Sequence, residues 1–90
     1  MKGGLRTSSL ELLRNEMKRQ RDKWGARSHD SPYWAIILME EVGEAAKAIL
    51  DQSPSGDLKD ELVQVAAVCI SWLQAMEDSR RRWGRRNREG

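Results

Sequence analysis

The sequence predicts an all-α protein whose three main helices form a helical bundle completed by oligomerisation. Three observations support this prediction. Apolar residues recur at helical spacing in three segments. No stretch of useful length alternates apolar and polar residues as a half-buried strand would. The chain has 90 residues and one cysteine, so it can bury only a small core and cannot form an internal disulfide.

The first helix is predicted over about residues 9–23. The sequence SSLE at residues 8–11 has the form of a capping box, which satisfies free backbone N–H groups at a helix start. Gly25 is a typical residue just beyond a helix end. The apolar positions that follow helical spacing are Leu10, Leu13, Met17 and Trp24.

The second helix is predicted from Ser31 to about Leu50, because Ser31 can cap it and Pro32 suits the first helical position. After a linker rich in turn residues, Asp57 is the predicted N-cap of a third helix that reaches Asp78 or beyond. The apolar stripes are Trp34, Ile37, Leu38, Ala45, Ala48 and Ile49 in the second helix, and Leu58, Leu62, Val65, Val68, Cys69, Trp72, Leu73 and Met76 in the third.

Residues 1–79 are predicted to form a single helical domain, followed by an arginine-rich tail at residues 80–90 that can be disordered. The net charge is +2, but residues 80–90 contribute +5, which leaves −3 for residues 1–79. No apolar run approaches the roughly 20 residues that span a bilayer, and the chain becomes polar too soon for a signal peptide. We therefore expect a cytoplasmic protein without a membrane partner.

Carboxylates stand at helix positions where a core would place apolar side chains. Glu41 falls within the apolar stripe of the second helix, and Glu44 lies one turn further on. Glu61 falls within the stripe of the third helix, with Gln64 one turn further on. Oxygen ligands on two helices suit Mg²⁺ or Mn²⁺, whereas no histidine or cysteine spacing suggests zinc. For any single glutamate, an ordinary solvated helix face is the competing interpretation.

These residues resemble the motif of the MazG-like branch of the all-α NTP pyrophosphatases, which reads E-E-x-x-E followed by E-x-x-D. The first half is matched by Glu40-Glu41-Val42-Gly43-Glu44 and the second by Glu61-Leu62-Val63-Gln64. The likeness covers about residues 16–77 and includes the segment RQRDKWG at residues 19–25. It implies a MazG-like helical fold and a magnesium-dependent nucleoside triphosphate pyrophosphohydrolase that removes unwanted nucleotides.

The resemblance also implies roles for individual residues. Glu41, Glu44 and Glu61 would bind Mg²⁺, and Glu40 would orient the nucleophilic water or a second metal. Gln64 stands in place of the fourth acidic ligand, which is a departure because an amide oxygen brings no negative charge. The implied reaction is attack of a metal-activated water on the α-phosphorus, with a nearby glutamate as proton acceptor.

Further residues are candidates for contacts with the nucleotide. Lys47 and Lys59 are candidate phosphate ligands, although each has the competing interpretation of a surface lysine. The base could be bound by Trp24, His29 and Tyr33, which lie between or beside the first two helices. Trp24 can instead anchor a helix end. Three further side chains are assigned to the core or a subunit interface: Trp34, Trp72 and Cys69.

Two other functions compete with the enzyme. The arginines of residues 80–90 could bind nucleic acid electrostatically, but no recognition-helix or zinc-finger pattern accompanies them, and we do not expect a nucleic-acid partner. A catalytically inactive helical scaffold, marked by Gln64, is the second alternative. The apolar stripes predict a homodimer or a homotetramer in either case.

Overall fold

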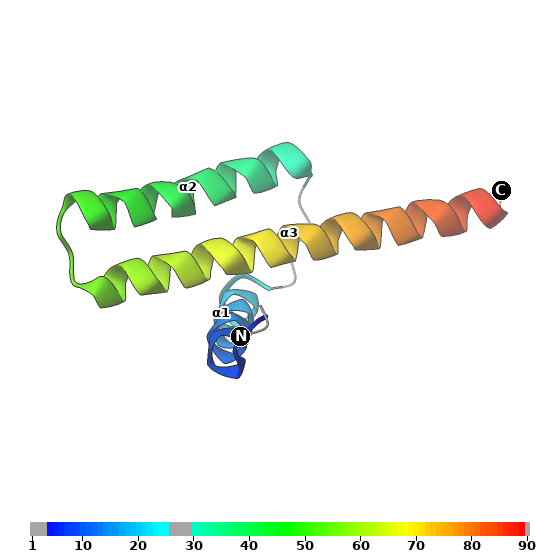
Figure 1. The fold of residues 1–90 in the computed structure, drawn as a ribbon. Helices are drawn as coiled ribbons and strands as arrows, with labels where there is room; N and C mark the ends of the chain where they lie inside the picture. Colours follow the sequence, from blue (N-terminus) through cyan, green and yellow to red (C-terminus); the bar gives the residue numbers. More distant parts are fainter. Residues whose placement is uncertain (1–3, 26–29, 90) are drawn as a thin grey trace.

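The fold is entirely helical over the part of the chain that is described. The computed structural model describes residues 4–25 and 30–89, of which residue 24 and residues 79–89 are described by their backbone alone. The helices are α1 (Thr7–Trp24), α2 (Ser31–Leu50) and α3 (Ser55–Glu89) (Figure 1). The described residues contain no strand and no helix long and apolar enough to cross a membrane. The predicted all-α fold with three helices is confirmed.

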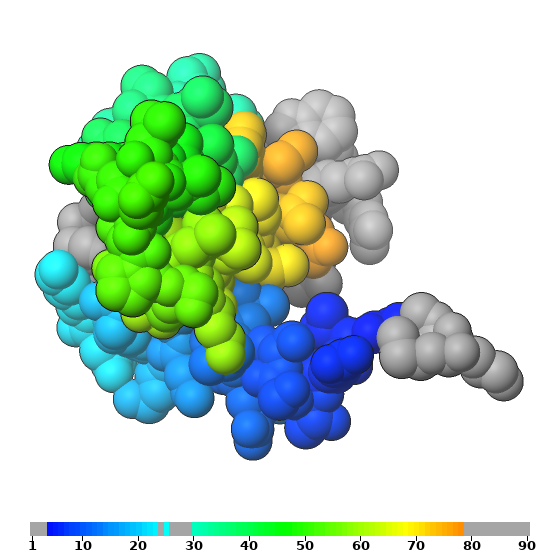
Figure 2. Space-filling view, turned by 60° about the vertical axis from the view of Figure 1, so that its left-hand side comes forward, coloured from blue at the N-terminus to red at the C-terminus, as the bar shows by residue number. Residues whose placement is uncertain are grey.

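Helix α3 is the central element of the structure. It forms an antiparallel hairpin with α2, and α1 packs across it on another side (Figure 1). The backbone of α1 packs only against α3, because α1 and α2 do not approach each other closely. In Figure 2 the α1 residues and the α2 residues accordingly flank α3 on two sides. Side chains from α1 and α2 therefore meet only where both reach over α3.

The start of α1 differs from the prediction. The helix begins at Thr7, with Arg6 as its N-cap and no side-chain hydrogen bond to the cap. The backbone N–H of Leu10 already donates to the carbonyl of Arg6 at 3.0 Å. The predicted capping box at residues 8–11 is wrong, because these residues lie inside the helix. At the other end Gly25 takes a φ of 79°, which glycine adopts without strain, and the predicted stop is confirmed.

The cap of α2 is displaced by one residue from the prediction. Asp30 is the N-cap, and its carbonyl accepts hydrogen bonds from the backbone N–H groups of Tyr33 and Trp34 at 3.1 Å each. Ser31 is the first helical residue, so the prediction that it caps the helix is wrong. Its Oγ instead lies 3.3 Å from Trp72 Nε1, which donates a hydrogen bond to it. This contact joins the start of α2 to α3.

Helix α3 begins earlier and runs further than its sequence signals indicate. It starts at Ser55, and the backbone N–H of Asp57 already donates to the carbonyl of Pro54 at 2.9 Å. Asp57 therefore lies in the first turn instead of capping it. The backbone of residues 80–89 continues the helix, where a tail that can be disordered was predicted.

The core of a single chain is small. Among the described residues, the buried apolar side chains are Trp34, Ala45, Ala67 and Val68. Trp34 is only 6% exposed, which confirms its place in the core. Four members of the predicted stripes are exposed instead: Ile49, Leu62, Leu73 and Met76. Helical spacing identified one side of each helix, but it did not show how much of that side a neighbouring helix covers.

Ala67 and Ala66 provide a test of the packing at the centre of α3. Ala67 is 0% exposed, whereas Ala66 is exposed on the same turn. Ala67→Leu should lower the free energy of unfolding by about 1–3 kcal/mol, because a close-packed position has no room for three more carbons. Ala66→Leu is the matched control and should change it by less than about 0.5 kcal/mol. Urea denaturation followed by circular dichroism measures both, and equal losses would contradict this packing.

Candidate functional site

Carboxylates from all three helices gather over the first half of α3. They are Glu16 of α1, Glu41 of α2 and Glu61 of α3, and the charges of Glu16 and Glu61 both act on Glu41. Glu41 and Glu61 are half-buried, and the Oε2 atom of each is shielded from solvent without a hydrogen-bond partner. Unpaired buried carboxylate oxygens are costly. A hard cation between these two helices would satisfy them, so the donor atoms present fit Mg²⁺ or Mn²⁺.

The environment of Glu41 disfavours its charged form. Burial is the largest cause that raises the pKa of Glu41 above its ordinary value. The negative charge of Glu61 follows, together with the hydrogen bond that the two carboxyl groups can form only when one of them carries a proton, and the charges of Glu44 and Glu16 add smaller contributions. A proton therefore binds to Glu41 more readily in the folded chain than in the unfolded chain. The same negative potential would attract a cation.

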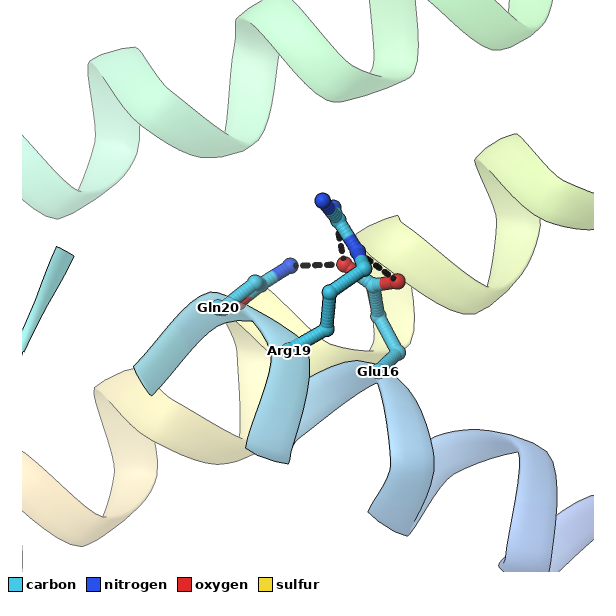
Figure 3. A network of polar contacts seen from close by, with 3 residues as sticks. All are labelled: Glu16, Arg19 and Gln20. Atoms are coloured by element: carbon cyan, nitrogen blue, oxygen red, sulfur yellow. Dashed lines mark hydrogen bonds and ion pairs between the residues drawn. The ribbon is translucent and has the colours of Figure 1, made fainter. Parts of the chain in front are cut away.

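Glu16 is held in its charged form by its neighbours on α1. Arg19 donates from Nε to Glu16 Oε1 at 2.9 Å and from Nη2 to Oε2 at 2.7 Å, and Gln20 Nε2 donates to Oε2 at 2.8 Å (Figure 3). The hydrogen bonds from Arg19 are the main cause that lowers the pKa of Glu16, against an opposing effect of burial. Such a two-point guanidinium contact fixes the carboxylate in one orientation.

Arg19 also links this network to the other carboxylates. Its hydrogen bonds to Glu16 are the main cause that raises the pKa of Arg19, and the negative charge of Glu41 adds to the effect. Arg19 is exposed, so its attraction to the cluster is screened by water. It is nevertheless a cation close to the Glu41 carboxylate, and it offsets part of the negative charge at the crossing of the helices.

The predicted metal ligands are only partly assembled. The structure brings Glu41 and Glu61 together, whereas Glu44 is exposed one turn further along α2 and Gln64 is half-buried one turn further along α3. Among the residues described, no three His, Cys, Asp or Glu side chains are placed to hold a metal ion. A third carboxylate ligand would have to come from Glu44 or Glu16 by side-chain rotation.

A cavity of about 420 Å³ lies beside the carboxylates, and Glu41 forms part of its wall. This volume is within the range of roughly 300–1,000 Å³ that is usual for small-molecule sites. The described lining residues come from all three helices and from Gly25 just after α1: Met17, Gln20, Arg21, Gly25, Tyr33, Trp34, Ile37, Glu40, Glu41, Val68, Ser71, Gln74 and Asp78. The cavity thus combines two aromatic rings with several hydrogen-bonding groups and one carboxylate of the Glu41–Glu61 pair.

The remaining predicted site residues are distributed unevenly around the cavity. Tyr33 and Glu40 line it. Lys47 and Lys59 are exposed and are not among the lining residues. The side chain of Trp24 and the whole of His29 lie outside the described part of the chain.

Several residues at the site were missed by the interpretation of the sequence. Glu16 is three residues after Leu13 and therefore on the same helix face, which is the signal that identified Glu41. Ser71 and Gln74 follow Val68 at intervals of three, so they extend the inner face of α3 with polar groups. Both signals were present in the sequence. Only the crossing of α1 over α3 shows that they belong to one site.

Comparisons of the chain with models of protein families, with curated proteins and with solved structures found no match. What the site can do therefore follows from its own side chains. The half-buried pair of carboxylates, Glu41 and Glu61, can bind a hard cation. The adjoining cavity can take a flat polar ligand against its aromatic rings.

The raised pKa of Glu41 leads to a prediction about stability and pH. The protonated form is favoured in the folded chain, so its stabilising effect is complete below the ordinary pKa of 4.5 and is lost as the pH rises through the raised pKa. Glu41→Gln replaces the carboxyl group by an amide that does not ionise, so the variant does not lose this stability as the pH rises. At pH 7 in EDTA its urea midpoint should be higher than that of the wild type, and the difference should shrink towards pH 4. Denaturation across this pH range measures it.

Glu11→Gln is the matched control, because Glu11 is an exposed carboxylate on α1 that does not line the cavity. It should leave the urea midpoint at pH 7 close to that of the wild type. If Glu41→Gln were instead less stable than the wild type at pH 7, the Glu41 carboxylate would have a stabilising partner that the structure does not contain.

Proposed function

We propose that this chain is a divalent-metal-dependent nucleoside triphosphate pyrophosphohydrolase of the MazG-like kind. The observation that supports this most strongly is the position of the Glu41 and Glu61 carboxylates, which have unpaired buried oxygens and adjoin a cavity of about 420 Å³. Carboxylates on rigid helices suit a hard cation, and the cavity suits a nucleoside. The reaction class itself comes from the resemblance of the two acidic half-motifs.

In this proposal Glu41 and Glu61 hold the metal, and Glu44 rotates inward to join them. Glu44 already acts electrostatically on Glu41, and it is one helical turn away, on the same side of α2. A bound Mg²⁺ would supply a water of lowered pKa and neutralise part of the triphosphate charge. Glu16, fixed by Arg19 and Gln20, keeps a further negative charge facing the metal ligands.

Glu40 is the proposed proton acceptor of the reaction. It lines the cavity next to Glu41 but is itself exposed, so its carboxylate can approach a water molecule in the cavity without first being desolvated. A general base must lie within hydrogen-bonding distance of the proton that it removes. The position of Glu40 at the cavity wall supports that role.

The rest of the cavity is suited to the nucleoside. Tyr33 and Trp34 provide aromatic surface against which a base can pack. Gln20, Ser71 and Gln74 provide uncharged donors and acceptors for the edges of the base and the sugar. Of the described residues that line the cavity, Arg21 alone is basic, and it is the proposed contact for phosphate.

The proposal leads to a direct prediction of activity. With Mg²⁺ or Mn²⁺, the purified protein should convert at least one nucleoside triphosphate into monophosphate and pyrophosphate. Glu41→Gln and Glu61→Gln should each lower kcat by a factor of 100 or more, since a typical metal ligand contributes several kcal/mol to transition-state stabilisation. Ion-exchange separation of products from a panel of ribo- and deoxyribonucleotides measures this.

Glu11→Gln is the matched control for these variants. Glu11 is an exposed carboxylate on α1 that does not line the cavity, so its substitution should leave activity unchanged. If no nucleotide is cleaved with either metal at high enzyme concentration, the chain is an inactive scaffold with this fold and the proposal fails.

Gln64 supplies a second prediction, because it occupies the place of an acidic ligand in the resembling motif. Gln64→Glu adds a carboxylate one turn after Glu61 on a half-buried face of α3. The Mg²⁺ concentration at half-maximal activity should fall about tenfold or more, which corresponds to about 1.4 kcal/mol. Metal titration of the activity measures this, and an unchanged or higher requirement would show that Gln64 lies outside the metal site.

A further inference from the structure

The outer face of α2 is apolar and uncovered. Trp34, Glu41 and Ala45 mark the inner face of this helix, and the opposite face exposes large hydrophobic side chains. Ile36 is 59% exposed, Met39 66% and Leu50 81%. Met39 follows Ile36 by three residues and Leu50 follows Met39 by eleven, spacings that keep all three on one stripe along the helix. An exposed apolar stripe of this length is typical of a protein interface.

Gly43 lies at the centre of this stripe. It is seven residues after Ile36 and seven before Leu50, and helical spacing places all three on one line along α2. Gly43 is exposed, and a Cβ atom placed on it would meet nothing within 4 Å. The subunit itself therefore does not require glycine here. A glycine in the middle of a helix costs stability, but it allows another helix to approach closely.

The subunit has more surface than a folded monomer of its size. Its accessible area is 7519 Å², whereas a monomer of 10.3 kDa exposes about 5,400 Å². Its radius of gyration is 15.9 Å, against about 12 Å for a compact domain of 90 residues. A standard interface needs about 800 Å² from each partner. The excess of about 2,100 Å² belongs to the whole chain, including the end of α3 that projects beyond α1 and α2 (Figure 1), and it is larger than this requirement.

We propose that a second copy of this chain packs antiparallel along the outer face of α2, with the two-fold axis passing beside Gly43. In this arrangement Ile36 faces Leu50 of the partner subunit, and Leu50 faces the partner's Ile36. Ile36 and Leu50 are placed symmetrically about Gly43, so this line of the stripe is complementary to itself, as a two-fold interface requires.

The charges beside the stripe favour the antiparallel orientation. Glu40 and Lys47 are seven residues apart and lie on the same edge of the stripe. An antiparallel pair centred on Gly43 places Glu40 within about one residue rise, about 1.5 Å along the axis, of the partner's Lys47. The symmetry produces this ion pair twice. In a parallel pair, Glu40 would instead meet the other edge of the partner's stripe. The residues along that edge are Ala35, Val42, Ala46 and Ile49.

The dimer would bring a basic residue to each cavity from the other subunit. Glu40 lines the cavity, whereas Lys47 of the same chain does not. The partner's Lys47, paired with Glu40, would stand at the cavity rim. In terms of the function proposed above, on which this step rests, that lysine is a phosphate contact supplied in trans.

Light scattering after size-exclusion chromatography tests the interface without reference to activity. The wild type should be a dimer or larger at micromolar concentration. Gly43→Arg should reduce it to monomer, because two guanidinium groups would meet on the axis. Gly56→Arg is the matched control, since Gly56 is also in a helix with open space around it but lies outside the stripe. This variant should keep the wild-type mass, and circular dichroism should show that both variants remain helical.

Disulfide trapping tests the orientation. In a Cys69→Ser background, an equimolar mixture of Ile36→Cys and Leu50→Cys chains should form a mixed disulfide dimer on mild oxidation, and Ile36→Cys alone should not cross-link. Charge reversal is an independent test. Lys47→Glu alone should raise the dimer dissociation constant at least tenfold. The double variant Lys47→Glu with Glu40→Lys should bring this constant most of the way back to the wild-type value.

Three results would overturn the proposed interface. They are a monomeric wild type at all concentrations tested, a Gly43→Arg variant with the mass of the wild type, or an Ile36→Cys variant that cross-links to itself. None of them bears on the nucleotide assays with Glu41→Gln. Conversely, an inactive protein that dimerises in this way would contradict only the proposed function.

Discussion

The carboxylates of Glu41 and Glu61 repel each other where α2 packs on α3, and this repulsion limits the core that one chain can form. These side chains occupy the position over α3 where packing of α2 would otherwise favour apolar residues, and each has an unpaired buried oxygen. Carboxylates cannot contribute to a hydrophobic core. The buried apolar set among the described residues is accordingly reduced to Trp34, Ala45, Ala67 and Val68, and much of the remaining apolar surface faces outward. A site of this kind therefore limits the stability of a lone subunit.

The helices themselves could be predicted from the sequence because helical periodicity and turn residues are local signals. Gly25 and the stretch between α2 and α3 were identified correctly as breaks. The helix starts were not, because Arg6 and Asp30 occupy the N-cap positions where serines were expected, and neither makes a side-chain cap hydrogen bond. The sequence also did not show which apolar side chains a neighbouring helix covers. Ile49 and Leu62 follow the spacing of a core face, but no neighbouring helix of the same chain covers them.

Part of the site could also be predicted, because an interrupted apolar stripe is a local signal too. Glu41 and Glu61 interrupt apolar stripes, and the structure places their carboxyl groups together. The contribution of α1 could not be predicted, because it depends on where that helix crosses α3. Glu16, Arg19 and Gln20 therefore became visible as a network only in three dimensions. The assignment of Lys47 to the same cavity is not supported by the geometry of one chain.

The attachment of α1 has a consequence for motion. Helix α1 packs on α3 but not on the backbone of α2, so one wall of the cavity belongs to α1 and the others to the α2–α3 hairpin. Detachment of α1 would open the cavity while leaving the hairpin and its Trp72–Ser31 hydrogen bond intact. A molecule bound between the two parts would hold them together and, by mass action, suppress this partial unfolding. Ligand occupancy would thus set how often the chain opens and how easily a protease can reach its first helix.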